Sequence, residues 1–236
     1  AAMQDALSPS SALYEGRPDV IIAALTLDLL SEPLTGSFAS LSSAEAESEK
    51  SKVISYSASL ISALRANCPA TIIIHSMQTP AWPAFGILDS QGAGFQTAAI
   101  AEINEAIRAA SAKAGNCYIM SIDSLAARAG AASFNDPRMR HIAKIPYTRE
   151  AFRLIAFEYM KYIRARLGKN KKCLVLDCDN TLWGGIIGED GIENIKLGDT
   201  FPGSCYKDFQ KAILNLYRRG VVLALCSKNN ERDATA

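Results

Sequence analysis

The chain has 236 residues, of which 49% are hydrophobic, and a formal charge of +1 from 25 basic and 24 acidic residues. This length suits one large or two small domains, with enough apolar residues to bury a core. The balanced charge argues against an overall electrostatic attraction to nucleic acid or to a membrane surface. No run approaches the roughly 20 apolar residues of a membrane span. We therefore expect a cytoplasmic globular protein.

Strand and helix signals alternate along the first two thirds of the chain. Asp19 to Leu25 is a continuous apolar run that predicts a first buried strand, and Thr71 to His75, rich in β-branched residues, predicts a second. Between them, a periodic pattern from Ser43 to Leu64 predicts a long helix that ends before Pro69. Segments without periodicity, many of them rich in Pro, Gly or Ser, are expected to be irregular; these are residues 1–18, 31–43, 78–94 and 131–148.

Three further elements continue the alternation. They are a helix around Ile100 to Ile107, a strand from Cys117 to Ile122 and a helix capped by Thr148 that runs through Ile163. Because strands alternate with helices throughout, we predict an α/β protein with two three-layer, parallel-sheet lobes. The basic stretch from Arg164 to Lys172 is the expected junction between lobes at residues 1–165 and 166–236.

The stretch from Lys171 to Gly185 organises the second lobe. Cys173 to Leu176 predicts a strand buried on both faces, and it stops at the acidic pair Asp177 and Asp179. Ligands of open α/β sheets bind beyond the carboxyl ends of the strands, so these carboxylates are placed to meet a substrate. Two carboxylates so close repel unless a cation or a shared proton intervenes, and hard oxygen ligands suit Mg²⁺. A carboxylate held in this way can also attack a phosphoryl group.

Residues 177–181 (Asp-Cys-Asp-Asn-Thr), coming after an apolar strand, resemble motif I of the haloacid dehalogenase (HAD) superfamily. Residues 182–191 resemble the continuation found in the FkbH-like subfamily. A bare Asp-x-Asp is common in solvated turns, but the preceding strand and the long continuation favour a site. The resemblance implies that Asp177 is the nucleophile, that Asp179 is the general acid and that both hold Mg²⁺. It also implies two phosphate-binding side chains, Asn180 and Thr181.

The rest of the second lobe contains a turn signal and a second strand. Gly188 to Gly191 predicts the turn of a hairpin flap over the site, followed by a helix from Ser204 to Arg219 and a strand from Val221 to Cys226. Ser227 after this strand is either a helix cap or a phosphate ligand. It resembles HAD motif II, which favours the second alternative and adds two neighbours to the phosphate site, Lys228 and Asn229.

HAD enzymes also carry a later basic residue and a later acid that completes the Mg²⁺ shell. Neither is expected before Ala236. We therefore expect the 236 residues to be a fragment that binds Mg²⁺ weakly and is inactive when assayed alone.

The first lobe resembles the SGNH-hydrolase-like domain of FkbH-like proteins, with its first strand missing. The matching parts are residues 11–20, Asn104 and residues 135–138. No Gly-Asp-Ser turn occurs, and Asp136 and His141 are five residues apart instead of three, so a hydrolase triad is not supported. His75 and His141 are expected to be structural or solvent-facing. Basic residues after Asp136 form either a solvated face or a docking surface for an acidic carrier protein; these are Arg138, Arg140 and Lys144.

The six cysteines show no Cys-x-x-Cys spacing, which favours reduced thiols over a disulfide framework. Cys173 and Cys226 lie in apolar runs and are expected to be small core residues. The FkbH-like resemblance implies that an acyl group passes through an enzyme thioester, for which Cys178 and Cys173 are the candidates.

The same resemblance implies a function. FkbH-like enzymes dephosphorylate 1,3-bisphosphoglycerate and load the glyceryl unit onto the phosphopantetheine thiol of an acyl carrier protein for polyketide-type biosynthesis. The acidic pair itself indicates only phosphoryl transfer. Two alternatives therefore stay open: a plain HAD phosphatase acting on a small phosphorylated metabolite, and a non-catalytic module that docks a carrier protein.

Overall fold

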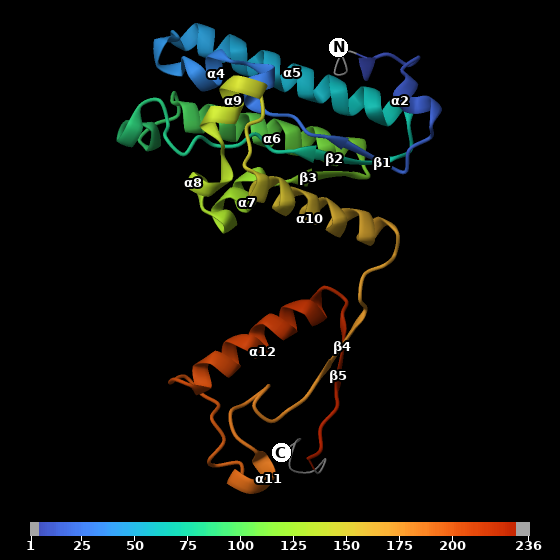
Figure 1. Cartoon of the computed structure of the whole chain (residues 1–236), viewed down its shortest axis with the longest axis vertical. Helices are drawn as coiled ribbons and strands as arrows, with labels where there is room; N and C mark the ends of the chain where they lie inside the picture. The colour runs from blue at the N-terminus through green and yellow to red at the C-terminus, as the bar shows by residue number, and fades with distance from the viewer. Residues whose placement is uncertain (1–4, 230–236) are drawn as a thin grey trace. The chain divides into compact units, whose positions relative to one another are not determined.

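The computed structural model describes residues 5–229. The chain divides into two compact units, unit 1 at Ala1–Leu167 and unit 2 at Gly168–Ala236 (Figure 1). The division falls inside the basic stretch from residue 164 to 172. No helix among residues 5–229 is long and apolar enough to cross a membrane.

Unit 1 is built on a three-stranded parallel sheet in the order β1 (Val20–Ala23), β2 (Thr71–His75) and β3 (Cys117–Met120). The register pairs Ile21 with Ile72 and Ile73 with Tyr118. These strands confirm the predicted α/β class and the parallel sheet. The third strand ends two residues earlier than predicted, because Ser121 accepts a hydrogen bond from Ser124 N and caps α7 (Ile122–Ala129).

Helices cover both faces of this sheet. One face carries α5 (Ser43–Asn67) and α6 (Gln96–Ala114), and the other carries α7 and α10 (Arg149–Arg166) (Figure 1). Every residue of β2 is buried, and its side chains alternate between the layers. Ile72 and Ile74 pack into the core beneath α5 and α6, whereas Ile73 packs with Ile155 of α10. Unit 1 is therefore a three-layer structure.

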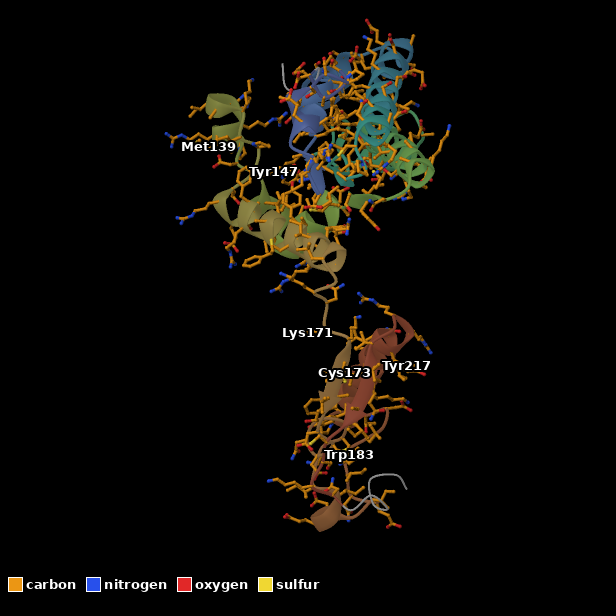
Figure 2. The ribbon with its side chains drawn as sticks, turned by 90° about the vertical axis from the view of Figure 1, so that its right-hand side faces the viewer. Met139, Tyr147, Lys171, Cys173, Trp183 and Tyr217 are labelled. Carbon is orange, nitrogen blue, oxygen red and sulfur yellow. The ribbon has the colours of Figure 1, made fainter. Side chains whose placement is uncertain are left out.

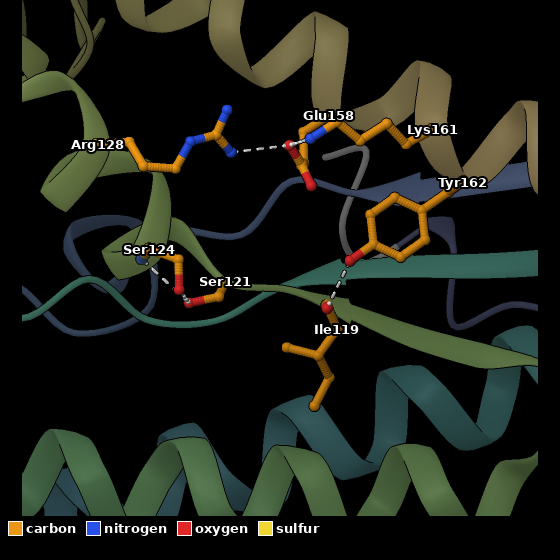
Figure 3. Close-up of polar contacts among 7 residues, drawn as sticks. All are labelled: Ile119, Ser121, Ser124, Arg128, Glu158, Lys161 and Tyr162. Atoms are coloured by element: carbon orange, nitrogen blue, oxygen red, sulfur yellow. Dashed lines mark hydrogen bonds and ion pairs between the residues drawn. The ribbon is translucent and has the colours of Figure 1, made fainter. Parts of the chain in front are cut away.

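Polar contacts hold α10 against the sheet (Figure 3). The Tyr162 hydroxyl donates to the Ile119 carbonyl of β3 over 2.9 Å. Glu158 pairs with Arg128 of α7 at 3.2 Å and with Lys161 at 2.6 Å. Exposed ion pairs contribute little to stability, so we attribute the placement of α10 mainly to its buried apolar residues.

Several segments expected to be irregular contain short helices instead. Each short helix satisfies part of its own backbone and several bury one apolar side chain, a pattern too brief to give a periodic signal. Asp136 accepts a hydrogen bond from Met139 N and starts one such helix, with Pro137 in its first turn. In these segments the short helices are α2 (Ala12–Glu15), α4 (Pro33–Gly36), η1 (Phe38–Ser40), η2 (Gly86–Ser90), α8 (Ala131–Phe134) and α9 (Pro137–Ala143). A further short helix, α3 (Leu27–Leu30), lies outside them and follows β1.

Unit 2 has two parallel strands, β4 (Cys173–Leu176) and β5 (Val222–Leu225), connected through α11 (Ile187–Asp190) and α12 (Gly203–Arg218). The prediction that β4 is buried on both faces is wrong, because Val175 is 60% exposed and Cys173 is exposed too. In Figure 1, α12 lies beside one face, and no other described helix covers the sheet. Cys173 and Cys226 are consequently exposed, which corrects their assignment to the core.

The predicted hairpin flap is also wrong. A single turn of helix, α11, replaces its strands, since Asp190 Oδ2 accepts a hydrogen bond from Ile186 N at 2.8 Å. Gly191, at φ +75°, ends the turn. The segment is closed at its base by an antiparallel bridge between Gly184 and Lys196.

Candidate active site

The acidic pair lies where β4 ends. Asp177 is exposed, and its Oδ1 accepts a hydrogen bond from Cys178 N at 2.7 Å. The backbone then turns, with Thr181 N and Leu182 N both donating to the Cys178 carbonyl, at 3.1 and 2.8 Å. This turn directs the two carboxylates beyond the strand end.

Asn180 shapes the loop that follows. It has φ +54°, a left-handed conformation that Asn tolerates better than most residues. Its Oδ1 accepts a hydrogen bond from Gly185 N at 3.0 Å. In this geometry the side-chain carbonyl of Asn180 holds the loop, so only its amide nitrogen is available for the predicted phosphate contact.

Asp179 is anchored by three donors on the same oxygen. Its Oδ1 accepts hydrogen bonds from Trp183 Nε1 at 3.0 Å, Ile187 N at 3.2 Å and Asn229 Nδ2 at 3.0 Å. Partial burial would raise the pKa of Asp179, but the donors, led by Asn229, outweigh it and hold this pKa below its usual value. Oδ2 accepts no hydrogen bond from the described residues and is the oxygen left for proton exchange.

The exit of β5 completes the site. Cys226 N donates to the Leu176 carbonyl at 2.8 Å, which continues the ladder one residue beyond β5. Ser227 Oγ accepts a hydrogen bond from Asn229 N at 3.2 Å, and the chain bends at Lys228 and Asn229. Lys228 is exposed. The structure thus brings the predicted site residues of both strand ends to one edge of the sheet.

The thiols of unit 2 are placed differently from expectation. Cys178 is 1% exposed and packs with Trp183 and Ile187. Cys173 begins β4, at the opposite end of the strand from the acidic pair, and Figure 2 shows it apart from Trp183. Cys226 is exposed and follows the ladder beside Asp177. Of these three thiols, Cys226 is therefore the one that is both exposed and close to the acidic pair.

Sequence reasoning missed two supports of the site. Trp183 donates to the acid four residues earlier in the chain, and a Trp closely following an acidic turn was the available signal. Gly184 approaches the ring of Tyr206 so closely that a Cβ there would lie 2.7 Å from it. A glycine pair after a buried aromatic residue hints at such an approach, but only the structure names the partner.

Comparison with known proteins gives one relationship. No protein-family profile and no curated sequence matches the chain. A crystal structure of the N-terminal part of a Bacteroides fragilis protein, described as containing a phosphatase domain and complexed with Mg, matches with a TM-score of 0.82 and 25% identity. The chain shares that fold. The match covers 98% of this chain and 60% of the other, so the chain spans less than two thirds of that structure's length.

The structure assembles no hydrolase triad among the described residues of unit 1, as the sequence analysis expected. Asp136 caps α9, and His141 is exposed. Ser76 Oγ accepts a hydrogen bond from Ile122 N, and Asn104 forms two hydrogen bonds with the backbone of Met77. These side chains hold the segments that leave β2 and β3.

The basic residues of unit 1 split into two groups. Arg140 pairs with Asp28 of α3 at 2.5 Å. Arg138 and Lys144 are exposed and form no ion pair with a described residue. Only these last two remain free for the predicted carrier surface.

Proposed function

We propose that the chain belongs to a Mg²⁺-dependent phosphoryl-transfer enzyme of the HAD type. The observation that carries the proposal is the division of labour within the acidic pair: Asp177 is exposed at the strand end, while Asp179 is locked beside it by three donors. The fold shared with a phosphatase-containing protein crystallised with Mg supports it.

The chemistry assigned to the pair follows from this division. Asp177 attacks the phosphorus atom, the bond to the leaving oxygen breaks, and an aspartyl-phosphate forms. Asp179 gives a proton to the leaving oxygen through Oδ2 and afterwards takes one from the water that releases phosphate. An approaching phosphate adds negative charge, which raises the pKa of Asp179 and lets it carry this proton. Trp183, Ile187 and Asn229 keep the carboxylate in one orientation during both steps.

The donor set fits Mg²⁺, which is commonly bound through one or two carboxylates, several waters and substrate phosphate. Asp177 and Asp179 would hold the ion. Among residues 5–229, no group of three His, Cys, Asp or Glu side chains could hold a metal, so a tighter all-protein cage is not formed there. The bound ion would offset the charge of the acidic pair and of the transferring phosphoryl group. Phosphate contacts are assigned to Asn180, Thr181, Ser227, Lys228 and Asn229.

The finer assignment rests on the FkbH-like resemblance. We propose that the substrate is 1,3-bisphosphoglycerate, that the acceptor is an acyl carrier protein and that unit 1 is an SGNH-like domain. For the enzyme thioester we now favour Cys226 over Cys178 and Cys173, because it is exposed beside Asp177. A plain phosphatase would need no such thiol. A non-catalytic module that docks a carrier protein would need neither the Cys226 thiol nor the anchored carboxylate of Asp179.

The test uses the full-length natural protein with Mg²⁺, 1,3-bisphosphoglycerate and a holo carrier protein. Phosphate release and the mass of the carrier are followed together. Phosphate release with a glyceryl mass on the carrier supports the full proposal, and release without that mass supports the plain phosphatase. Asp177→Asn should abolish release, whereas Glu193→Gln, which removes an exposed acid of the same unit, should not. If no phosphate is released from several small phosphate esters, the chain is not a phosphoryl-transfer enzyme, and the non-catalytic docking module is favoured.

A further inference from the structure

Two adjoining cavities lie at the edge of unit 1 where its parallel strands end. Their volumes are about 330 and 930 Å³, a size that holds small organic ligands. Strand ends are also where open α/β sheets bind ligands. The two share wall residues from α3 and from the segment around α9; these are Thr26, Asp28, Arg140, His141, Pro146 and Tyr147. We treat them as one site, the strand-end cavity.

The strand-end cavity has a free hydroxyl in its wall. Tyr147, labelled in Figure 2, is 7% exposed and lines both parts of the cavity. Its ring packs edge-on against Phe134 and Phe152, which fixes its position. Its hydroxyl forms no hydrogen bond with any described residue. The hydroxyl is not one of the fully enclosed, unpartnered polar atoms, so it can be reached from the cavity and is available to a ligand there.

Two polar side chains of the larger part, His75 and Tyr159, are uncharged near neutral pH. The His75 ring lines the larger part, and its Nε2 shares a hydrogen bond of 2.5 Å with the Tyr159 hydroxyl. Burial lowers the pKa of His75 to about 4 and raises the pKa of Tyr159 to about 12. Burial also raises the pKa of Tyr147, so this hydroxyl keeps its proton and can donate it.

The rim carries both signs of charge. Asp28 and Arg140 neutralise each other in their ion pair. Glu32 and Lys144, which are distant in sequence, both line the larger part. Neither has an ion-pair partner among the described residues. The rim therefore selects neither cations nor anions. The remaining wall is largely apolar, with Leu29, Phe152, Ile155 and Ala156.

We propose that the strand-end cavity binds a small uncharged acyl compound, whose carbonyl oxygen accepts a hydrogen bond from Tyr147 and whose aliphatic chain packs against Phe152 and Ile155. The charges of the rim balance one another, and a carboxylate placed against Phe152, Ile155 and the neutral His75 would lose its hydration, which disfavours the charged form of the same acid. The site lies in unit 1 and does not depend on the phosphoryl-transfer proposal.

The test compares hexanamide with hexanoate by saturation-transfer NMR titration of the whole chain. Hexanamide should bind roughly threefold to tenfold more tightly than hexanoate, and Tyr147→Phe should remove a similar factor from the amide. Tyr118→Phe, which removes an exposed hydroxyl outside the cavity, should change nothing. Ala156→Phe should fill the cavity and abolish binding, whereas Ala165→Phe at an exposed position of the same helix should not.

Circular dichroism confirms that each variant is folded before its titration is interpreted. Equal binding of both probes, or unchanged binding to a folded Ala156→Phe variant, would show nonspecific association and overturn the proposal. So would the absence of binding of either probe to the unaltered chain.

Discussion

The side-chain amide of Asn229 donates a hydrogen bond to Asp179 Oδ1 across 3.0 Å, although 50 residues separate the two in sequence. The bond joins the exit of β5 to the exit of β4. An acid of the first strand is therefore held in place by the second, and the orientation of Asp179 depends on correct parallel pairing. This relationship makes Asn229 a positioning residue as well as a candidate phosphate ligand.

Replacing Asn229 should raise the pKa of Asp179. The variant Asn229→Ala removes one of three donors that favour the charged carboxylate, so protonation becomes easier. A pH titration of the carboxyl carbon of Asp179 by NMR, in the absence of Mg²⁺, measures the change. Asn215→Ala, at an exposed position of α12, serves as the control. An unchanged Asp179 pKa in Asn229→Ala would mean that the bond does not form in solution.

Binding of Mg²⁺ should be weak and should depend on Asp177. Two carboxylates and water hold the ion less tightly than a complete cage, and removing the exposed carboxylate takes away a direct ligand. Calorimetry should detect no binding to Asp177→Asn, while the control Glu193→Gln, with the same loss of charge, binds as before. Equal affinities for Asp177→Asn and the unaltered chain would refute the metal assignment.

The cysteines should differ in their rate of alkylation. Brief treatment with iodoacetamide, read by peptide mass spectrometry, should label Cys173, Cys205 and Cys226, which are exposed. Cys68 and Cys178 are buried and should react slowly until the chain is unfolded in urea. Labelling of Cys178 as rapid as that of Cys226 would contradict the packing of Cys178 against Trp183 and restore its candidacy as the acyl carrier.

Gly203 should not tolerate a methyl group. A Cβ there would lie 2.7 Å from Gly198 N and 3.0 Å from the Leu197 carbonyl carbon, and these backbone atoms have little freedom to move. Gly203→Ala should lower the free energy of unfolding of unit 2 by about 1 to 3 kcal/mol. Gly188→Ala is the control, since its Cβ would meet no atom within 4 Å. The two variants are compared by urea unfolding, followed by the fluorescence of Trp183. Both carry Trp82→Phe, so that Trp183 is the remaining tryptophan. Equal midpoints for the two variants would refute the close approach.

Unit 1 should lose stability as the pH falls from 6.5 to about 4, because the buried side chain of His75 resists protonation. Burial lowers the pKa of this residue from 6.5 to about 4, so the unfolded chain takes up the proton first. The stability that neutral His75 contributes is complete above pH 6.5 and is lost between pH 6.5 and 4. At about 1.4 kcal/mol per pKa unit, the loss between pH 7 and 4.5 should be roughly 2 to 3 kcal/mol.

This loss is measured by pulsed hydrogen exchange of peptides from β2 across a urea titration at both pH values. His75→Gln should reduce the loss, whereas His141→Gln, at an exposed position, should leave it unchanged. If His75→Gln and the unaltered chain lose the same stability, the buried neutral histidine is not the cause.

Short-range patterns in the sequence determined much of this protein. Continuous apolar runs predicted all five described strands, because strands of parallel sheets carry side chains into helical layers. The acidic pair at the end of one such run predicted the place of the candidate site. Ser43 to Leu64 and the Thr148 cap predicted two of the three long helices that cover the first sheet, one on each face.

Tertiary structure decided which residues meet and which are buried. The run Cys173 to Leu176 has the composition of a core strand, yet burial depends on a second covering layer that a local pattern does not reveal, and Val175 is exposed. The bond from Asn229 to Asp179 and the place of Cys226 beside Asp177 follow from strand register, which is a pairing between distant segments. Local periodicity carries no record of such pairing, because it reflects only the faces of single elements.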